Sequence, residues 1–215
     1  MQIASRQASN RPGTATKNKG QARLASIIDA ARTVFIRAGY AGFSMRRVAQ
    51  EAGISIGNLS YYYRTKKDLL RDLTDHVVDG YLAEFDRIRG RPGLTPREQL
   101  AGILGFWIDD LTSASTTAFF PELWALGNHD PYIAGLVDSL YTRARRPLVE
   151  LMPLINPSLA RRDVERLALF MCAAMEGLTV FAGHGKPWTG QMPELRALSV
   201  ATFMKLIDAN DSYKS

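Results

Sequence analysis

Two short helical patterns separated by a glycine turn constrain this chain most, and they lie between Ser44 and Tyr63. The Ser44 hydroxyl can cap free backbone N–H groups, so we expect a helix to start there. Gly53 ends this pattern, and Ser55 offers the same capping chemistry to a second helix that ends near Tyr63. Helix, turn and helix is the spacing of a helix-turn-helix, whose second helix enters the major groove of DNA.

The turn itself, GISIG at residues 53–57, also fits the G-x-S-x-G pattern of a hydrolase nucleophile elbow. In that interpretation Ser55 would be an acyl-transfer nucleophile. An elbow needs a strand that enters the turn, whereas the preceding segment SMRRVAQEAG is helical by pattern. We therefore expect no catalytic residue and no enzyme activity, and a small helical hydrolase remains only an alternative.

The remainder of the chain is patterned as helices, with no run of alternating residues that predicts a strand. The fold class expected is all-α: a three-helix helix-turn-helix domain joined to a larger helical domain, to which the family resemblance described below assigns ligand binding and dimerisation. We expect Pro147 to kink or split the helix that Asp130-Pro131 opens. The other helices are expected to start at Gln21 and Thr95-Pro96 and to cover about 66–89, 117–127, 161–182 and 193–209. The domains expected are a basic flexible arm at 1–20, a DNA-binding domain at 21–66 and the helical domain at 67–215.

Charge separates the two parts of the 215-residue chain, whose formal net charge is +6. Residues 1–70 contain 12 basic and three acidic side chains, a balance of +9, whereas residues 71–215 contain 15 basic and 18 acidic ones, a balance of −3. A basic head on a slightly acidic body indicates a polyanionic partner for the head alone. A solvated basic surface is the alternative. A helical scaffold that binds protein partners is a further candidate function, and the +9 balance of residues 1–70 argues against it.

Other classes of protein fit poorly. One cysteine, Cys172, excludes an internal disulfide framework and a zinc site with several cysteines. His129 beside Asp130 lacks the further ligands that a metal needs, so we expect no metal and no cofactor. The most apolar segment, 167–182, has only 16 residues and contains Glu176, so we expect a buried helix, no membrane contact and a cytoplasmic protein.

Several side chains have the chemistry that DNA contacts need. Ser55 and Ser60 are small and polar, and Asn58 can bond to base edges or phosphates. Tyr61 and Tyr62 have hydroxyls that can donate to phosphate oxygens, whereas we expect Tyr63 to lie in the core. Further contacts are expected at the starts of the flanking helices, from Ser44, Arg46 and Lys66.

The stretch AGYAGFSMRRVAQEAGISIGNLSYYYRTKKDLL resembles the DNA-binding domain of TetR-family transcriptional regulators. The resemblance lies in Gly39-Tyr40, the capping Ser44, the Val48-Ala49 pair, Ala52 to Ser55, Gly57 to Leu59 and Lys66 to Leu69, and covers roughly residues 21–70. It implies an all-helical homodimer that binds double-stranded DNA, usually an operator from which a small-molecule ligand releases it. It also implies that Ser55, Asn58, Ser60, Tyr61, Tyr62 and Lys66 contact DNA.

The chain departs from the family's usual pattern at three positions in this region. Tyr is common where this chain has Ser60, and His is common where it has Tyr62, so the phosphate contacts there are expected to differ. Ile56 is apolar where a polar or basic residue is common, and it is expected to meet a thymine methyl group. The arm at 1–20 would lie in the adjacent minor groove or remain an unattached tail.

The ligand-binding and dimerisation residues are expected in the second part of the chain, because pockets are mostly apolar and aromatic with a few polar groups. Most aromatic residues at helical spacing nevertheless belong to the core. Glu176 needs a partner, either a cationic or hydrogen-bonding ligand or an arginine of this chain or of its dimer mate. The resemblance places the dimer interface in 161–182 and 193–209. The candidates for effector binding are Phe106, Trp107, Phe120, Trp124, His129, Tyr141, Met175 and Glu176.

Overall fold

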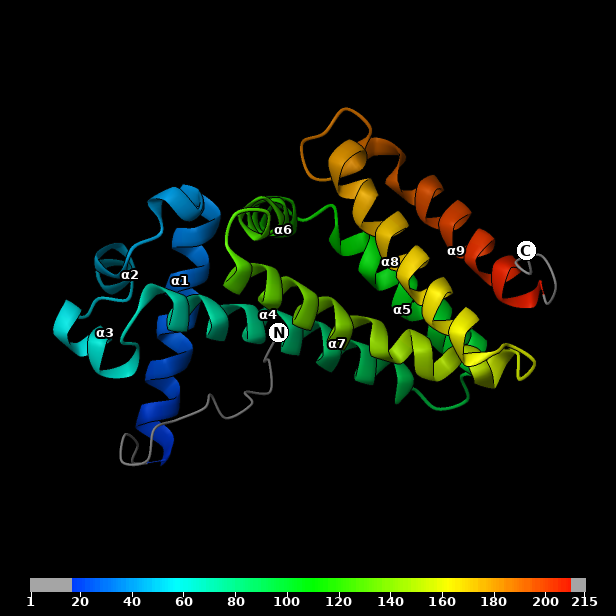
Figure 1. Cartoon of the computed structure of the whole chain (residues 1–215), viewed down its shortest axis with the longest axis horizontal. Coiled ribbons are helices and arrows are strands. Elements are labelled where there is room, and N and C mark those ends of the chain that lie inside the picture. The colour runs from blue at the N-terminus through cyan, green and yellow to red at the C-terminus, as the bar shows by residue number, and fades with distance from the viewer. Residues whose placement is uncertain (1–16, 210–215) are drawn as a thin grey trace. The chain divides into compact units, whose positions relative to one another are not determined.

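The structure is a computed structural model that describes residues 17–209 (Figure 1). Across this range the chain forms α-helices, one short 3-10 helix and no β-strand, which confirms the all-α class. None of these helices is long and apolar enough to cross a membrane. The helices are α1 (Lys17–Gly42), α2 (Met45–Glu51), α3 (Ile56–Tyr62), α4 (Lys66–Arg89), α5 (Pro96–Asp110), α6 (Ala114–Gly127), α7 (Pro131–Ile155), α8 (Arg161–Ala182), η1 (Thr189–Gln191) and α9 (Met192–Asp208).

Side-chain caps start the helices where the sequence predicts them. The Ser44 hydroxyl accepts the N–H of Arg47 at 3.3 Å in the first turn of α2. The Ser55 hydroxyl accepts the N–H of Asn58 at 3.1 Å at the start of α3. Thr95 forms a reciprocal capping box with the first turn of α5, since its backbone N–H donates to the carboxylate three residues later. These caps satisfy backbone donors that a helix start otherwise leaves unpaired.

Three expected boundaries are wrong. Helix α1 begins at Lys17, so the last four residues of the expected arm at 1–20 are helical, and the others lie outside the described residues. Helix α6 begins at Ala114, three residues before the expected start near 117. Helix α7 continues past Pro147 as one element. Burial of Leu148 and Leu151 beyond the proline stabilises the helix despite the lost backbone hydrogen bond.

By its internal contacts the chain forms two compact units. The first unit contains the described residues up to Ala83 together with Ala118–Leu140. The second contains Glu84–Thr117 and the described residues from Tyr141 onward. This grouping differs from a division at residue 66, because Ala118–Leu140, which includes most of α6 and the start of α7, belongs to the first unit. The expected division at residue 66 separates the residues that we expect to contact DNA from the rest of the chain. That functional division stays a prediction.

The core of the first unit forms where α1, α2 and α3 pack together. Phe35 of α1 is buried and lies edge-on to Phe43, with ring centroids 5.5 Å apart, and its ring also meets Phe119 of α6 at 5.0 Å. Val48 of α2 and Leu59 of α3 are also fully buried. The helix-turn-helix is therefore held by a continuous apolar core that leaves the other face of α3 in solvent.

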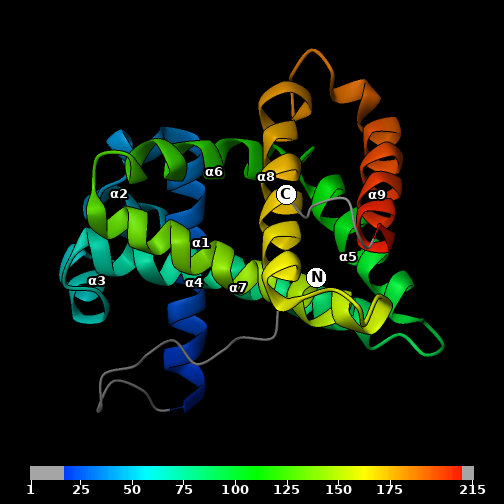
Figure 2. The same cartoon turned by 45° about the vertical axis from the view of Figure 1, so that its right-hand side comes forward.

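The second unit is a packed group of helices. Helix α9 packs against α5 and α8, and the three run side by side in both views (Figure 1 and Figure 2). Their inner faces bury apolar side chains such as Leu104 of α5, Met175 of α8 and Phe203 of α9. The amphipathic pattern of each helix thus decides which side faces the core.

Candidate DNA-binding and effector sites

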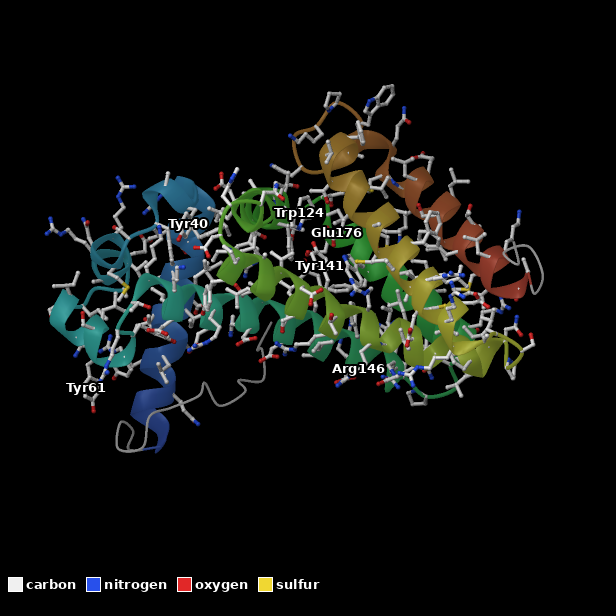
Figure 3. The ribbon with its side chains drawn as sticks, viewed as in Figure 1. Tyr40, Tyr61, Trp124, Tyr141, Arg146 and Glu176 are labelled. Atoms are coloured by element: carbon white, nitrogen blue, oxygen red, sulfur yellow. The ribbon has the colours of Figure 1, made fainter. Side chains whose placement is uncertain are left out.

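Helix α3 presents a mixed polar and apolar surface to solvent. Ile56 in its first turn is 49% exposed, and Tyr61 in its last turn is 55% exposed. Figure 3 shows Tyr61 projecting away from the body of the first unit. Asn58 and Ser60 on the same helix are also exposed. A helix this short that leaves an isoleucine and a tyrosine in water has a surface suited to contact with another molecule.

The turn before α3 has a structural role that excludes the elbow interpretation. Gly53 adopts φ = 64°, the left-handed conformation that ends α2. The Ser55 hydroxyl caps α3, and no strand enters the turn within residues 17–209. Gly57 lies inside α3, and a Cβ added there would find only the Ser55 Oγ, at 3.9 Å. No contact inside the chain requires glycine at this position, so its absent side chain leaves room on the outer surface of α3.

The residues flanking α3 on α2 divide into capping and exposed groups. Ser44 is occupied as the cap of α2, and Arg47 donates from Nη1 to the carbonyl of Gly42 at 3.2 Å. Arg46 is exposed on the same helix. Both arginines of α2 are exposed, but Arg47 is tied to the end of α1 by its bond to Gly42, whereas Arg46 is the one that we expect to contact DNA.

The tyrosine run at the end of α3 changes environment from one residue to the next. Tyr61 is exposed, and Tyr62 is half-buried with its ring edge-on to that of Tyr61, at a centroid distance of 5.4 Å. Tyr63 is 3% exposed, which confirms its expected place in the core. Only the first two tyrosines therefore have accessible hydroxyl-bearing faces.

Lys66 at the start of α4 has an internal partner that sequence reasoning missed. Its Nζ donates to the backbone carbonyl of Tyr40 at 2.9 Å and lies 3.3 Å from the centroid of the Tyr40 ring. Partial burial lowers the pKa of the Lys66 ammonium. An ammonium has three N–H donors, so this arrangement leaves donors for a phosphate. The phosphate contact of Lys66 stays a prediction.

The Gly39–Tyr40 segment is also held from α6. The Tyr40 N–H donates to Oε2 of Glu122 at 3.2 Å, 82 positions away in the sequence. Gly39 adopts φ = 59°, and a Cβ there would stand 3.1 Å from the Glu122 carboxylate. Lys67 forms an ion pair with Asp130 at 2.8 Å. Glycine 39 was recognisable in the sequence, but nothing in the sequence indicated Glu122 as its neighbour.

The candidate effector residues fall into both compact units. Phe120, Trp124 and His129 belong to the first unit. The rings of Phe120 and Trp124 lie 6.4 Å apart, and Phe120 also meets Tyr81 at 6.1 Å. His129 is exposed and lies beyond the end of α6. The structure therefore groups the two aromatic residues and separates His129 from the buried core.

The other candidates belong to the second unit, where Trp107 and Tyr141 bond to Glu176. Phe106 and Trp107 of α5 both contact the ring of Phe85, at 6.0 and 5.8 Å. Met175 is fully buried beside Glu176 on α8. Figure 3 labels Glu176 and Tyr141, which come from α8 and α7 of this unit. Four of the five candidates in this unit are aromatic or apolar, and the fifth is the carboxylate of Glu176.

Glu176 is bound by neutral donors of this chain. Trp107 Nε1 donates to Oε1 of Glu176 at 3.0 Å, and Tyr141 also makes a side-chain hydrogen bond to this carboxylate. Burial raises its pKa to about 7, the Asp110 charge adds to the rise, and the two hydrogen bonds oppose it. Among the alternatives left open by the sequence, hydrogen bonds from Trp107 and Tyr141 replace pairing with an arginine of this chain. Within the described residues no three His, Cys, Asp or Glu side chains gather as metal ligands.

Comparison with known proteins agrees with this architecture. Residues 27–73 match the family model "Bacterial regulatory proteins, tetR family", and residues 96–203 match the model "BetI-type transcriptional repressor, C-terminal". Relatives named HTH-type transcriptional regulator BetI, from Escherichia coli (strain SMS-3-5 / SECEC) and Shigella flexneri serotype 5b, are each 28% identical over 172 residues. Each match covers 77% of this chain and 85% of the relative.

Solved structures share the fold. Salmonella enterica GusR superposes with a TM-score of 0.74 at 16% identity, covering 91% of this chain and 100% of GusR. A putative transcriptional regulator from Pseudomonas aeruginosa PAO1 gives a TM-score of 0.68 at 20% identity, covering 89% of this chain and 91% of that one. At these identities the likeness concerns the fold.

The helix-turn-helix in the first unit and the family matches thus define a helix-turn-helix transcriptional regulator rather than an enzyme or a scaffold. The chain belongs to the tetR family of bacterial regulatory proteins, and its C-terminal part is of the BetI-type repressor class.

Proposed function

We propose that this protein is a homodimeric repressor that binds an inverted-repeat operator and is released from it by a small-molecule effector. The observation that carries the proposal is α3, a capped helix whose inner side is buried and whose outer side exposes Ile56, Asn58, Ser60 and Tyr61. In a helix-turn-helix this helix reads the major groove. A protein that binds chromosomal DNA in a bacterium acts in the cytoplasm.

The exposed residues fall into those suited to contact base edges and those suited to contact phosphates. Asn58 offers an amide that can bond to an adenine edge, and Ile56 offers a methyl-bearing surface for thymine. Ser55, Ser60, Tyr61 and Tyr62 offer hydroxyls, and Arg46 offers a cation, for the phosphates on either side. Ser44 and Lys66 can add phosphate contacts while keeping their internal hydrogen bonds, because a hydroxyl and an ammonium each have further capacity.

The dimer is supported by apolar side chains that α8 and α9 leave in solvent. Leu169, Phe170, Val180 and Phe181 of α8 and Leu198 of α9 are all more than half exposed. Exposed apolar area of this kind on two long helices is typical of an interface. A second copy of the chain is the occupant that places two α3 helices on a twofold axis, as an inverted repeat requires.

We expect the effector to bind in the helical domain, which supplies aromatic and apolar side chains together with a few polar ones. Phe106, Trp107, Tyr141, Met175 and Glu176 of the second unit supply such a set. Phe120 and Trp124 of the first unit supply a second aromatic pair. His129 is the least supported of the candidates, because its side chain is exposed.

Selection of binding sites from random DNA with the purified full chain at fixed salt tests the proposal. We expect enrichment of an inverted repeat. Asn58→Ala should weaken binding to that repeat by about tenfold or more while leaving random DNA nearly unaffected, because a base contact contributes about 1–3 kcal/mol of discrimination. A folded wild-type protein that enriches no sequence, in buffer or in cell extract, would contradict the proposed function. Equal losses on both DNAs would remove Asn58 from base reading.

A further inference from the structure

Helix α8 buries two polar atoms that have no hydrogen-bond partner among the described residues: Oε2 of Glu176 and Oγ1 of Thr179. The two residues are three positions apart, so their side chains lie on one face of the helix. Thr179 is 1% exposed. Buried polar atoms in folded proteins are nearly always hydrogen-bonded, and an unmet one destabilises the fold. Two such atoms on one face of α8 indicate a partner other than the described residues.

The surroundings hold the Glu176 carboxylate in position and leave one oxygen for that partner. Trp107 Nε1 donates to Oε1 at 3.0 Å, and Tyr141 adds a second hydrogen bond to the carboxylate. Both donors are neutral. The charged group that acts on Glu176 is Asp110, which carries the same sign and accepts a hydrogen bond from the Thr116 hydroxyl at 2.6 Å. All of these residues belong to the second compact unit.

We propose that Glu176 and Thr179 form the polar end of an effector site and that this site takes a small molecule with a protonated amine. An ammonium N–H can donate to Oε2 of Glu176, and a second N–H can donate to the Thr179 hydroxyl. Its positive charge offsets the negative charge that Glu176 and Asp110 bring together. A carboxylate ligand would meet repulsion here. The inference rests on the proposed function, because it names the class of effector that releases the repressor.

Four probes with one alkyl chain test the chemistry: hexylammonium, hexyltrimethylammonium, hexanol and hexanoate. Calorimetric titration of the full chain at pH 8 should give hexylammonium an affinity at least about tenfold above that of hexanoate, because a charge-assisted hydrogen bond is gained. Hexyltrimethylammonium keeps the charge without an N–H donor and should bind more weakly than hexylammonium. Hexanol, a neutral donor, should fall between the ammonium and the carboxylate.

Variants assign the effect to the two residues. Glu176→Gln should abolish the preference for hexylammonium over hexanoate, and Thr179→Val should reduce it. The matched control is Glu150→Gln, since Glu150 is an exposed carboxylate of the same unit that pairs with Arg89 at 2.9 Å. This control should leave the preference unchanged. Circular dichroism on each variant confirms that the helices are intact.

Three results would overturn the inference: equal affinity for hexanoate and hexylammonium, an unchanged preference in Glu176→Gln, or no measurable binding of any probe. In the last case the two atoms are hydrated by water alone. Operator binding is measured on the same preparations, which separates this inference from the proposed function. A wild-type protein that binds its operator without an amine preference contradicts the effector class only. An amine preference without operator binding contradicts the repressor.

Discussion

At the scale of single residues, Glu176 is the group whose chemistry the fold alters most. Burial and the Asp110 charge raise its pKa from 4.5 to about 7, against the opposing hydrogen bonds of Trp107 and Tyr141. The folded state therefore holds a proton that the unfolded state releases between these two pH values. Folding stability contributed by this group is highest below pH 4.5 and is lost as pH rises to about 7.

We predict that this loss amounts to about 3 kcal/mol, at about 1.4 kcal/mol per pKa unit. Glu176→Gln cannot titrate, so the difference in unfolding free energy between variant and wild type should shift in favour of the variant as pH rises from 5 to 8. Urea unfolding at both pH values measures the shift. Glu150→Gln serves as the control, because its carboxylate is exposed. A pH-independent difference for Glu176→Gln would show that the carboxylate is ionised throughout.

At the scale of elements, the last turn of α1 depends on Gly39, where the helix is kinked. Its backbone has φ = 59° and ψ = −177°, a combination that side chains disfavour. The Glu122 carboxylate accepts the N–H of Tyr40, and Lys66 donates to the carbonyl of the same residue. One peptide segment is thus tied to α6 and to α4 at once. The orientation of the helix-turn-helix within the first unit rests on this segment.

We predict that Gly39→Ala destabilises the protein by about 1–3 kcal/mol, because the backbone is strained and Glu122 must move away. Gly57→Ala is the matched control: its φ is ordinary and its nearest neighbour is 3.9 Å away, so stability should be unchanged or slightly raised. Thermal unfolding measures both. If DNA approaches α3 closely at Gly57, that control will lose operator affinity without losing stability. Equal stability losses in the two variants would contradict the role of Gly39.

At the scale of the whole molecule, α8 and α9 carry apolar side chains that a monomer would leave in contact with water. We predict that Leu198→Asp on α9 raises the dimer dissociation constant by at least about tenfold, because it places a charge in an apolar contact. Leu154→Asp on α7 is the matched control, since both leucines are 64% exposed. Sedimentation equilibrium measures the dissociation constant. An unchanged Leu198→Asp dimer, or an equal effect of Leu154→Asp, would exclude α9 from the interface.

Local features of this protein were predictable from its sequence. Ser44, Ser55 and Thr95 start helices where expected, because a cap is a contact between residues only three positions apart. Helix α8 has the predicted bounds, Arg161–Ala182, because an apolar stripe that repeats along the chain is visible without knowing what it packs against. The family resemblance extended this local reading to the class of protein.

Tertiary packing decided the rest. Lys66 and Glu122 both bond to Tyr40, which lies 26 and 82 positions away along the chain. Glu176 bonds to Trp107, which lies 69 positions away. Tertiary packing also kept α7 as one element at Pro147, where local rules predicted a kink or a split. In each case the decisive energy comes from groups that only the packing of separate helices brings together, and helix periodicity does not specify which helices meet. The sequence by itself therefore determined the helices and the class of regulator. The tertiary structure determined how the Gly39–Tyr40 segment is held and which buried polar atoms lack a partner among the described residues.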